Sequence, residues 1–184
     1  MQDWIIIDEK YLSYLRGFES RIPFSDYGAD KFKPFFGTLF EIGDLVYVTQ
    51  ISHPQKRHQI MRNSLDFYKI YSPSNGSIKS NRLIAVINLN YMFPIPKSII
   101  EFLDYRDIDK HREFSSVTEK SKYINLLKTE LAEINKINME SKAYKLYKLK
   151  QDYPENPISK RCIEFTELEE KAISYLQEYI TTNV

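Results

Sequence analysis

Residues 35–51 read FFGTLFEIGDLVYVTQI, and this stretch decides the fold. Aromatic and β-branched residues fill its two halves, Phe35 to Ile42 and Leu45 to Ile51, which is typical of β-strands. Gly43-Asp44 between them is a two-residue turn signal, so the stretch predicts an antiparallel hairpin. We therefore expect a sheet built around this hairpin.

Further strands are predicted on both sides of the hairpin. Trp4 to Ile7 is an apolar run typical of a strand, and Asp8 can cap a helix whose apolar residues recur at helical spacing. Residues 66–71 and the β-branched run 83–89 predict two more strands, the second of them central. The segment 91–96 fits only a sheet edge or a bend, because each of its prolines removes a ladder hydrogen bond.

The second part of the chain changes to a helical period. Helices are predicted to begin at Ser116, near Ser141 and at Thr166, the first and last with capping-box pairs. The order is a β-rich part, residues 1–103, followed by an α-rich part, residues 116–184. We expect a single α+β domain over residues 1–184, in which a twisted antiparallel β-sheet has flanking helices and further C-terminal helices.

The composition indicates a protein with one substantial core and says little about partners. The chain has 184 residues, 42% of them hydrophobic, and a net charge of +1. Its apolar runs fall far short of the ~20 residues of a membrane span, so we expect a cytoplasmic protein without a membrane partner. The single cysteine, Cys162, has no partner, and metal-ligand and nucleotide-binding motifs are missing, so no metal or cofactor is expected.

Charge is distributed unevenly along the chain. Residues 1–50 carry five Lys or Arg against eight Asp or Glu, whereas residues 53–82 carry six against one. Such a basic segment is what contact with a nucleic-acid backbone requires, but on charge alone an ordinary solvated surface stretch is the favoured interpretation.

The polar cluster Ser52-His53-Pro54-Gln55-Lys56-Arg57-His58 follows the hairpin directly and holds two of the three histidines. Its spacing alone fits a polar turn that leads into a short helix. The other interpretation is RNA cleavage, because the 2′-hydroxyl of RNA is a built-in nucleophile. A protein then need only take its proton, stabilise the phosphorane and protonate the leaving 5′-oxygen. The products would be a 2′,3′-cyclic phosphate and a 5′-hydroxyl.

Several phrases of the chain resemble the ToxN/AbiQ family of type III toxin–antitoxin endoribonucleases, over roughly residues 1–103. In the family's order they are Lys33-Pro34-Phe35-Phe36-Gly37, Tyr47 leading into the Ser52–His58 cluster, Asp66-Phe67-Tyr68-Lys69-Ile70, and Ile87-Asn88-Leu89-Asn90-Tyr91-Met92-Phe93-Pro94-Ile95. The resemblance implies a sheet similar to that of the Kid/MazF toxins and a metal-independent endoribonuclease toxin of phage abortive infection. The AbiQ-like members look like the nearer relatives.

The chain departs from the family at the catalytic phrase. Family members typically show Thr-Ser-Pro-Lys after the second hairpin strand, and a histidine three residues later. Aligned without a gap, Ser52, His53 and Gln55 take the Thr, Ser and Lys positions, so the usual catalytic lysine is absent. Either Lys56 replaces it, or His53 is an insertion and Ser52 is the family serine, or Lys33 and His53 share the proton transfer.

The candidate catalytic set combines this cluster with the preceding loop, where the resemblance implies active-site positions. It consists of Ser52, Lys33, His53, Lys56 and Tyr27. Ser52 leads the set because both alignments keep it. The basic segment and its neighbours supply the candidate RNA contacts, namely Lys31, Arg57, His58, Arg62, Lys79 and Arg82. Phe32 and Tyr68 are candidate stacking platforms, with core packing as the alternative for each.

The resemblance also implies the partners. The first is an RNA antitoxin made of tandem repeats, each folded as a pseudoknot, which the toxin cuts to unit length and which then blocks its groove. The second is cellular or phage RNA, the substrate of the free toxin. A closed ring of alternating protein and RNA is the implied assembly. The competing hypotheses are a non-catalytic RNA-binding module and a protein-interaction domain whose basic segment meets an acidic partner.

Overall fold

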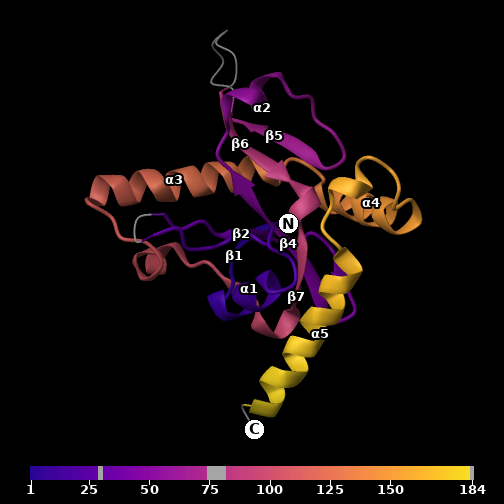
Figure 1. Ribbon diagram of the computed structural model, residues 1–184. Helices are drawn as coiled ribbons and strands as arrows, with labels where there is room; N and C mark the ends of the chain where they lie inside the picture. Colours follow the sequence, from indigo (N-terminus) through magenta and orange to yellow (C-terminus); the bar gives the residue numbers. More distant parts are fainter. Residues whose placement is uncertain (29–30, 74–81, 183–184) are drawn as a thin grey trace.

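The computed structural model describes residues 1–28, 31–73 and 82–182, and a single antiparallel sheet runs through its middle (Figure 1). Its strands in this part of the chain are β1 (Asp3–Ile6), β2 (Phe35–Gly37), β3 (Glu41–Ile42), β4 (Leu45–Ser52), β5 (Phe67–Tyr71), β6 (Leu83–Asn88), β7 (Phe93–Pro96) and β8 (Glu101–Phe102). The strand order is β5-β6-β4-β2-β1-β8, and β3 and β7 also pair with β4. The predicted antiparallel sheet with helices is confirmed.

The hairpin forms as predicted, but its first strand is interrupted. Gly43 takes a φ of 55° at the turn, a conformation that suits glycine. Phe36 pairs with Thr49 and Glu41 with Val46. The chain therefore advances five residues from Phe36 to Glu41 but only three along β4 from Val46 to Thr49. Two extra residues therefore bulge out between β2 and β3, and the single strand expected over residues 35–42 becomes two.

The close packing of β2 against β4 requires a glycine. A Cβ atom added at Gly37 would lie 2.9 Å from Val48 Cγ1 and 3.2 Å from the Tyr47 carbonyl oxygen. Phe35 and Phe36, which precede it, are fully buried. The short strand β2 therefore anchors the loop before it to the centre of the sheet.

Two further strand predictions are also confirmed. β6 lies between β5 and β4, and its residues Ala85, Val86 and Ile87 are buried, as expected of a central strand. β7 pairs only with β4 among the described strands, which places Pro94 and Pro96 where the missing backbone donors cost least. A hydrogen bond from the Tyr11 hydroxyl to the Pro94 carbonyl oxygen, 2.7 Å long, ties this edge to the first helix.

Five α-helices and four 3₁₀ turns occur in the described residues. They are α1 (Glu9–Arg16), α2 (Lys56–Ile60), α3 (Val117–Ile134), α4 (Met139–Asp152) and α5 (Phe165–Thr182), with η1 (Leu89–Tyr91), η2 (Lys97–Ile99), η3 (Tyr105–Lys110) and η4 (Ser159–Arg161). α3 crosses the middle of the molecule, α5 runs along β7 toward the C-terminus, and α2 lies beside β5 and β6 (Figure 1). No described helix is long and apolar enough to span a lipid bilayer.

The helix starts agree with the predicted caps in two cases out of three. Asp8 accepts a hydrogen bond from the backbone N–H of Lys10, and Ser116 accepts one from Glu119. The predicted cap at Thr166 is wrong, because α5 already begins at Phe165. Its expected partner, Glu169, instead accepts a 2.7 Å hydrogen bond from the buried Tyr47 hydroxyl.

One hydrophobic core joins the sheet to the C-terminal helices. It contains Phe35, Phe93 and Trp4 from the sheet together with Leu127 of α3 and Phe165 of α5. The Trp4 indole N–H donates a hydrogen bond of 3.1 Å to the Leu127 carbonyl oxygen, which fixes α3 against β1.

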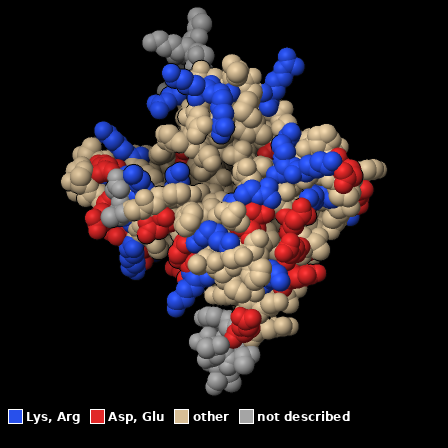
Figure 2. Space-filling model, in the orientation of Figure 1, with Lys and Arg blue, Asp and Glu red and all other residues tan. Residues whose placement is uncertain are grey.

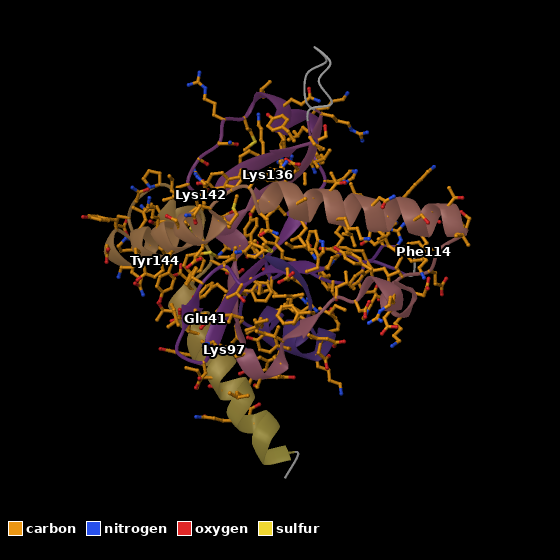
Figure 3. The ribbon with its side chains drawn as sticks, turned by 180° about the vertical axis from the view of Figure 1, so that it is seen from behind. Glu41, Lys97, Phe114, Lys136, Lys142 and Tyr144 are labelled. Carbon is orange, nitrogen blue, oxygen red and sulfur yellow. The ribbon has the colours of Figure 1, made fainter. Side chains whose placement is uncertain are left out.

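Seen from behind, Phe114 lies near one end of α3 and Lys136 just beyond the other, so the helix forms a long wall across the sheet (Figure 3). Phe32 and Tyr68, the candidate stacking platforms, are 5% and 8% exposed and belong to the core. Core packing, and not base stacking, is therefore what the structure shows for both rings.

Candidate active site

Gln50, near the end of β4, holds the loop that precedes β2 in place. Its side chain is buried, and its Nε2 donates hydrogen bonds of 2.9 Å to the carbonyl oxygens of both Phe24 and Lys33. Its Oε1 accepts a 3.3 Å hydrogen bond from the Tyr27 hydroxyl. The loop closes on itself through the Lys33 N–H, which donates to the Ser25 carbonyl oxygen. One strand residue thus positions two candidate catalytic residues.

A cavity of about 580 Å³ opens where this loop, the end of β4 and α3 meet. Ser52 is the last residue of β4, paired with Val86 of β6, and it lines the cavity. We call it the Ser52 cavity. Its polar lining consists of Tyr27, Lys31, Lys33, Ser52 and His53 from the loop and sheet side, and Arg112, Tyr123 and Glu130 from the side of α3.

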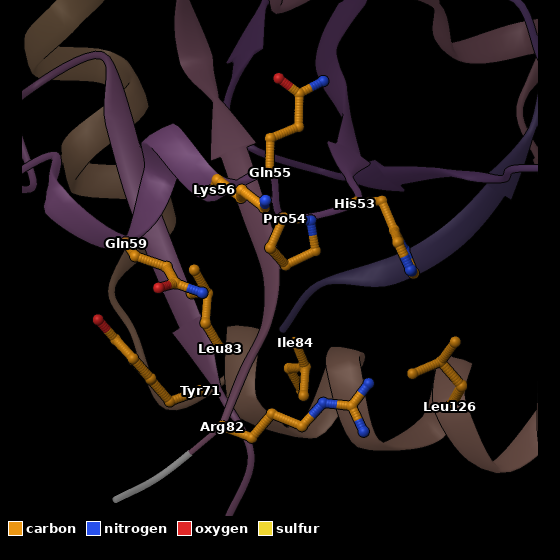
Figure 4. Close-up of a pocket in the computed structure, with 10 residues that line it drawn as sticks. All are labelled: His53, Pro54, Gln55, Lys56, Gln59, Tyr71, Arg82, Leu83, Ile84 and Leu126. Atoms are coloured by element: carbon orange, nitrogen blue, oxygen red, sulfur yellow. The ribbon is translucent and has the colours of Figure 1, made fainter.

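A second cavity, of about 750 Å³, lies on the other side of His53 (Figure 4). We call it the Arg82 cavity, and Lys56, Gln59 and Tyr71 also line it. The Arg82 guanidinium extends past Ile84 toward Leu126 of α3. The two cavities share His53 and Leu126, so they form one continuous groove along α3.

The structure brings most of the candidate catalytic residues together. Tyr27, Lys33, Ser52 and His53 line the Ser52 cavity, whereas Lys56 begins α2 and lines only the Arg82 cavity. Of the three arrangements that the sequence leaves open, this placement favours Lys33 and His53 as the groups that share proton transfer.

The side chain of Lys33 packs against the ring of Tyr27. Its Nζ lies 4.8 Å from the centre of the Tyr27 ring, a distance at which the aromatic face stabilises a cation. Burial raises the pKa of the Tyr27 hydroxyl, so this group remains a hydrogen-bond donor at neutral pH. The pair therefore presents an ammonium group at the cavity wall.

The wall formed by α3 and the residues before it contains polar groups that the sequence interpretation missed. Arg112 packs over the Tyr123 ring at 4.3 Å and pairs with Glu119 at 2.9 Å. The Tyr123 hydroxyl donates a 2.6 Å hydrogen bond to the Phe32 carbonyl oxygen, and burial raises its pKa to about 12.

Glu130, 3% exposed, is the most unusual member of this wall. Burial raises the pKa of its carboxyl group to about 8. Leu127, Glu130 and Ile134 share one face of α3, so a carboxylate on an otherwise apolar stripe was the available sequence signal.

The candidate RNA contacts are divided between the groove and its surroundings. Lys31 lines the Ser52 cavity and Arg82 the Arg82 cavity, while Arg57 and Arg62 are exposed outside the lining of both. Lys79 lies outside the described residues. Figure 2 shows Lys and Arg side chains gathered over the upper part of the molecule, around α2, β5 and β6, with the acidic side chains mostly lower on this face.

His58 is a correction to that set. It is buried, and its Nδ1 accepts a 3.0 Å hydrogen bond from the backbone N–H of Gln55. Its Nε2 accepts from Arg57 at 3.3 Å, and burial lowers the pKa of the ring, which disfavours a charged imidazole. His58 therefore holds the start of α2 in shape and does not face the groove.

The described residues contain no group of three or more His, Cys, Asp or Glu side chains placed to hold a metal ion. Cys162 is buried, and burial raises the pKa of its thiol to about 12. The groove instead combines ammonium, guanidinium, imidazole, hydroxyl and carboxyl groups, which are suited to proton transfer and to contacts with phosphate.

The sequence model of the family described as Toxin ToxN, type III toxin-antitoxin system, matches residues 4–173. The chain belongs to this family. Endoribonuclease ToxN of Pectobacterium atrosepticum is 33% identical over 100 residues, which cover 53% of the chain. The aligned stretch spans 56% of that relative's length.

Three solved structures have the same fold as this chain. One, described as an antiviral system regulated by a processed non-coding RNA, is 25% identical with a TM-score of 0.70, covering 92% of this chain and 96% of the other. A type III toxin inhibited by a non-coding RNA pseudoknot is 22% identical, with a TM-score of 0.72 and coverages of 95% and 97%. AbiQ, a lactococcal anti-phage endoribonuclease, is 18% identical, with a TM-score of 0.72 and coverages of 96% and 99%.

Proposed function

We propose that this ToxN-family protein is a metal-independent endoribonuclease toxin that acts in the cytoplasm and in phage abortive infection. The observation that carries the proposal is the convergence of Tyr27, Lys33, Ser52 and His53 on one cavity. The family membership and the likeness to Endoribonuclease ToxN support RNA as the substrate.

The proposed reaction needs only the side chains of the Ser52 cavity. His53 takes the proton of the 2′-hydroxyl, whose oxygen attacks the adjacent phosphorus and forms the new O2′–P bond. The bond between phosphorus and the 5′-oxygen breaks, and the leaving oxygen takes a proton from the Lys33 ammonium. The products are a 2′,3′-cyclic phosphate and a 5′-hydroxyl.

The remaining residues stabilise the phosphorane and hold the participants. The Ser52 hydroxyl donates a hydrogen bond to a non-bridging phosphate oxygen, where negative charge develops in the transition state. The Tyr27 ring keeps Lys33 at the wall of the cavity. Lys56 and Arg82, on the far side of His53, bind the RNA backbone next to the cleaved bond.

We further propose that an RNA antitoxin of tandem pseudoknot repeats occupies this groove, after the toxin has cut it to unit length. Support comes from the structural likeness to a toxin that a non-coding RNA pseudoknot inhibits. A closed ring of protein and RNA is the assembly we expect, since each repeat then joins two toxin molecules. Native mass spectrometry of the purified complex measures its stoichiometry.

The experiment incubates purified protein with a labelled single-stranded RNA in excess EDTA and identifies the new ends. We expect cleavage with 5′-hydroxyl ends. Ser52→Ala should lower kcat/KM by about 10²–10³-fold through loss of a transition-state hydrogen bond. Ser174→Ala, at a half-buried serine of α5 outside the lining of both cavities, is the matched control and should cleave normally.

The outcomes separate the two RNA hypotheses. New 5′-phosphate ends, or cleavage that EDTA abolishes, would overturn the proposed mechanism. Salt-sensitive RNA binding without any cleavage would identify the runner-up, a non-catalytic RNA-binding module, for which Gln55 at the family's lysine position is the favouring observation.

A further inference from the structure

The Glu130 carboxyl group is the one buried acid in the wall of the Ser52 cavity. No hydrogen bond or ion pair joins it to any residue among 1–28, 31–73 and 82–182, and burial alone raises its pKa. Its carboxyl oxygens are not among the fully enclosed, unpaired polar atoms of the described residues, so they open onto the cavity and are available to a bound ligand.

The rest of this wall is mostly apolar or already engaged. Leu126, Leu127 and Phe32 line the cavity around Glu130 and offer no partner, and the Tyr123 hydroxyl is bound to the Phe32 carbonyl oxygen. Arg112, the cationic residue of this wall, pairs with Glu119 through its Nη2 atom, and its buried Nε has no hydrogen-bond partner in the described residues. On this wall the fold therefore leaves two groups without a partner, the Arg112 Nε and the Glu130 carboxyl group.

We propose that Glu130 is a substrate-binding residue, whose carboxyl group hydrogen-bonds the edge of an RNA base next to the cleaved bond. This inference rests on the proposed endoribonuclease function. The cavity, about 580 Å³, falls within the range of roughly 300–1,000 Å³ typical of ligand pockets. Unpaired RNA bases are commonly bound in this way, with the flat faces against apolar surface and the edge hydrogen-bonded.

The chemistry of a neutral carboxyl group fits a base edge. Its carbonyl oxygen accepts one hydrogen bond and its hydroxyl donates another, which matches the neighbouring donor and acceptor on a Watson–Crick edge. A carboxylate has only acceptors and would also repel the phosphates beside it. The neutral form is the one that burial favours at pH 7.

Other titratable and charged groups surround Glu130, and their ionisation also contributes to the pH dependence of cleavage. Those lining the same cavity are Tyr27, Lys31, Lys33, His53, Arg112 and Tyr123. Lys69 and Tyr71 lie on β5, which packs against α3 farther along the helix. The variant series therefore compares Glu130 substitutions with one another, so that the contributions of these groups cancel.

The experiment measures kcat/KM for cleavage between pH 6 and 9 in wild type, Glu130→Gln and Glu130→Leu. The amide of Glu130→Gln keeps one donor and one acceptor, so cleavage at pH 7 should stay within about threefold of wild type. Glu130→Leu leaves the base edge unpaired and should lower kcat/KM about 10–100-fold, mainly through KM. Glu133→Gln, one turn along α3 and paired with Lys136, is the matched control and should resemble wild type.

The pH profile distinguishes a binding role from a purely structural one. The ratio of wild-type to Glu130→Gln activity should fall above pH 8, about tenfold for each further pH unit, because only the wild type ionises there. Equal kcat/KM for all variants at every pH, with each variant folded, would overturn the inference while the proposed function stands.

Absence of cleavage by the wild type would instead overturn the proposed function, and binding then tests Glu130 separately. In that case fluorescence anisotropy with a short single-stranded RNA at pH 7 should show weaker binding by Glu130→Leu than by Glu130→Gln. Equal affinity of these two variants would overturn the inference on its own.

Discussion

Gln50 connects the sheet to the loop that carries two of the proposed catalytic residues. It is buried, and its amide satisfies two loop carbonyl oxygens as well as the Tyr27 hydroxyl. The amide therefore fixes the position of the Lys33 backbone beside the Ser52 cavity. Gln50 itself does not line that cavity. Catalytic geometry at this site depends on a residue that the proposed reaction never uses.

Replacing Gln50 by leucine should lower the rate of RNA cleavage strongly and the free energy of unfolding only moderately. Two carbonyl oxygens and one hydroxyl lose their partner, which costs about 1–3 kcal/mol in the free energy of unfolding. Displacement of Lys33 should lower kcat by about 10–100-fold at unchanged pH optimum. Urea unfolding and single-turnover cleavage measure the two effects, and Gln50→Glu, which keeps an acceptor for Tyr27, should fall between. An unchanged kcat would show that Lys33 needs no such support.

Glu130 makes the stability of the protein depend on pH in an unusual direction. Its folded pKa of about 8 lies above the ordinary value of 4.5, so the folded protein holds a proton that the unfolded chain releases. The favourable contribution is complete below pH 4.5 and is lost as pH rises toward 8.

The comparison with Glu130→Gln isolates this effect. The variant should gain stability over wild type progressively from pH 5 to pH 8, by about 1.4 kcal/mol for each pH unit, and the gain should level off above pH 8. Thermal unfolding at several pH values measures it. A constant difference between the two proteins across this range would contradict the assigned ionisation.

At the residue scale, the sequence predicted the candidate site only where the chain itself brings residues together. Ser52 and His53 adjoin the hairpin and Lys33 precedes it, so the sequence placed the three near one another, and the structure brings them to one cavity. Glu130 is far away in sequence and reaches the cavity only because α3 packs over β1 through Trp4. His58 was misplaced for the opposite reason, since local spacing does not reveal that its ring turns inward to accept a backbone N–H.

At the element scale, the start of β5 and the turn before α5 are joined by a single ion pair. Asp66 is buried and accepts hydrogen bonds of 2.9 and 3.0 Å from Arg161, which follows α4 in the chain. Burial alone would raise the pKa of Asp66, but the hydrogen bonds from Arg161 and Ser64 outweigh it and lower the pKa. The Asp66–Arg161 ion pair therefore connects the β-rich part of the chain to the α-rich part.

Removal of the arginine should weaken that connection. Arg161→Ala leaves a buried carboxylate with only Ser64, and because the arginine is half exposed we expect a loss of about 1–3 kcal/mol in the free energy of unfolding. The lowered pKa stabilises the fold at neutral pH, and this contribution is lost as pH falls through the carboxylate range. The wild-type advantage should therefore shrink below pH 4 in urea titrations. Lys160→Ala, the neighbouring exposed ion pair, should cost little.

The elements themselves were predictable where local rules decide them. Gly43, Asp8 and Ser116 act through their own backbone neighbours, and each turn or cap formed as expected. The division of the first hairpin strand into β2 and β3 was not predictable, because it depends on the register against β4. The Thr166 cap failed because α5 already begins at Phe165, and Glu169 is bound to the Tyr47 hydroxyl instead.

At the scale of the whole molecule, the groove along α3 combines charge from separate parts of the chain. Lys31 and Lys33 come from the loop before β2, Lys56 from α2 and Arg82 from the residue just before β6. The net charge of the protein is only +1, so attraction for RNA must come from this local arrangement and not from the total charge. The sequence showed part of this arrangement as the basic segment 53–82.

If the groove binds an RNA backbone, the salt dependence of RNA binding should report how many phosphates the protein contacts. For a single-stranded nucleic acid, the logarithm of affinity falls against the logarithm of salt concentration with a slope of about 0.7 for each phosphate contacted. We expect the double variant Lys56→Ala, Arg82→Ala to reduce that slope by about 1.4, measured by anisotropy in a Ser52→Ala background that leaves the RNA intact. Lys97→Ala is the control, because Lys97 lies outside the groove and pairs with Glu41 at 2.6 Å. If the control lowers the slope as much as the double variant, binding is not confined to the groove, and the backbone contacts assigned to Lys56 and Arg82 are wrong.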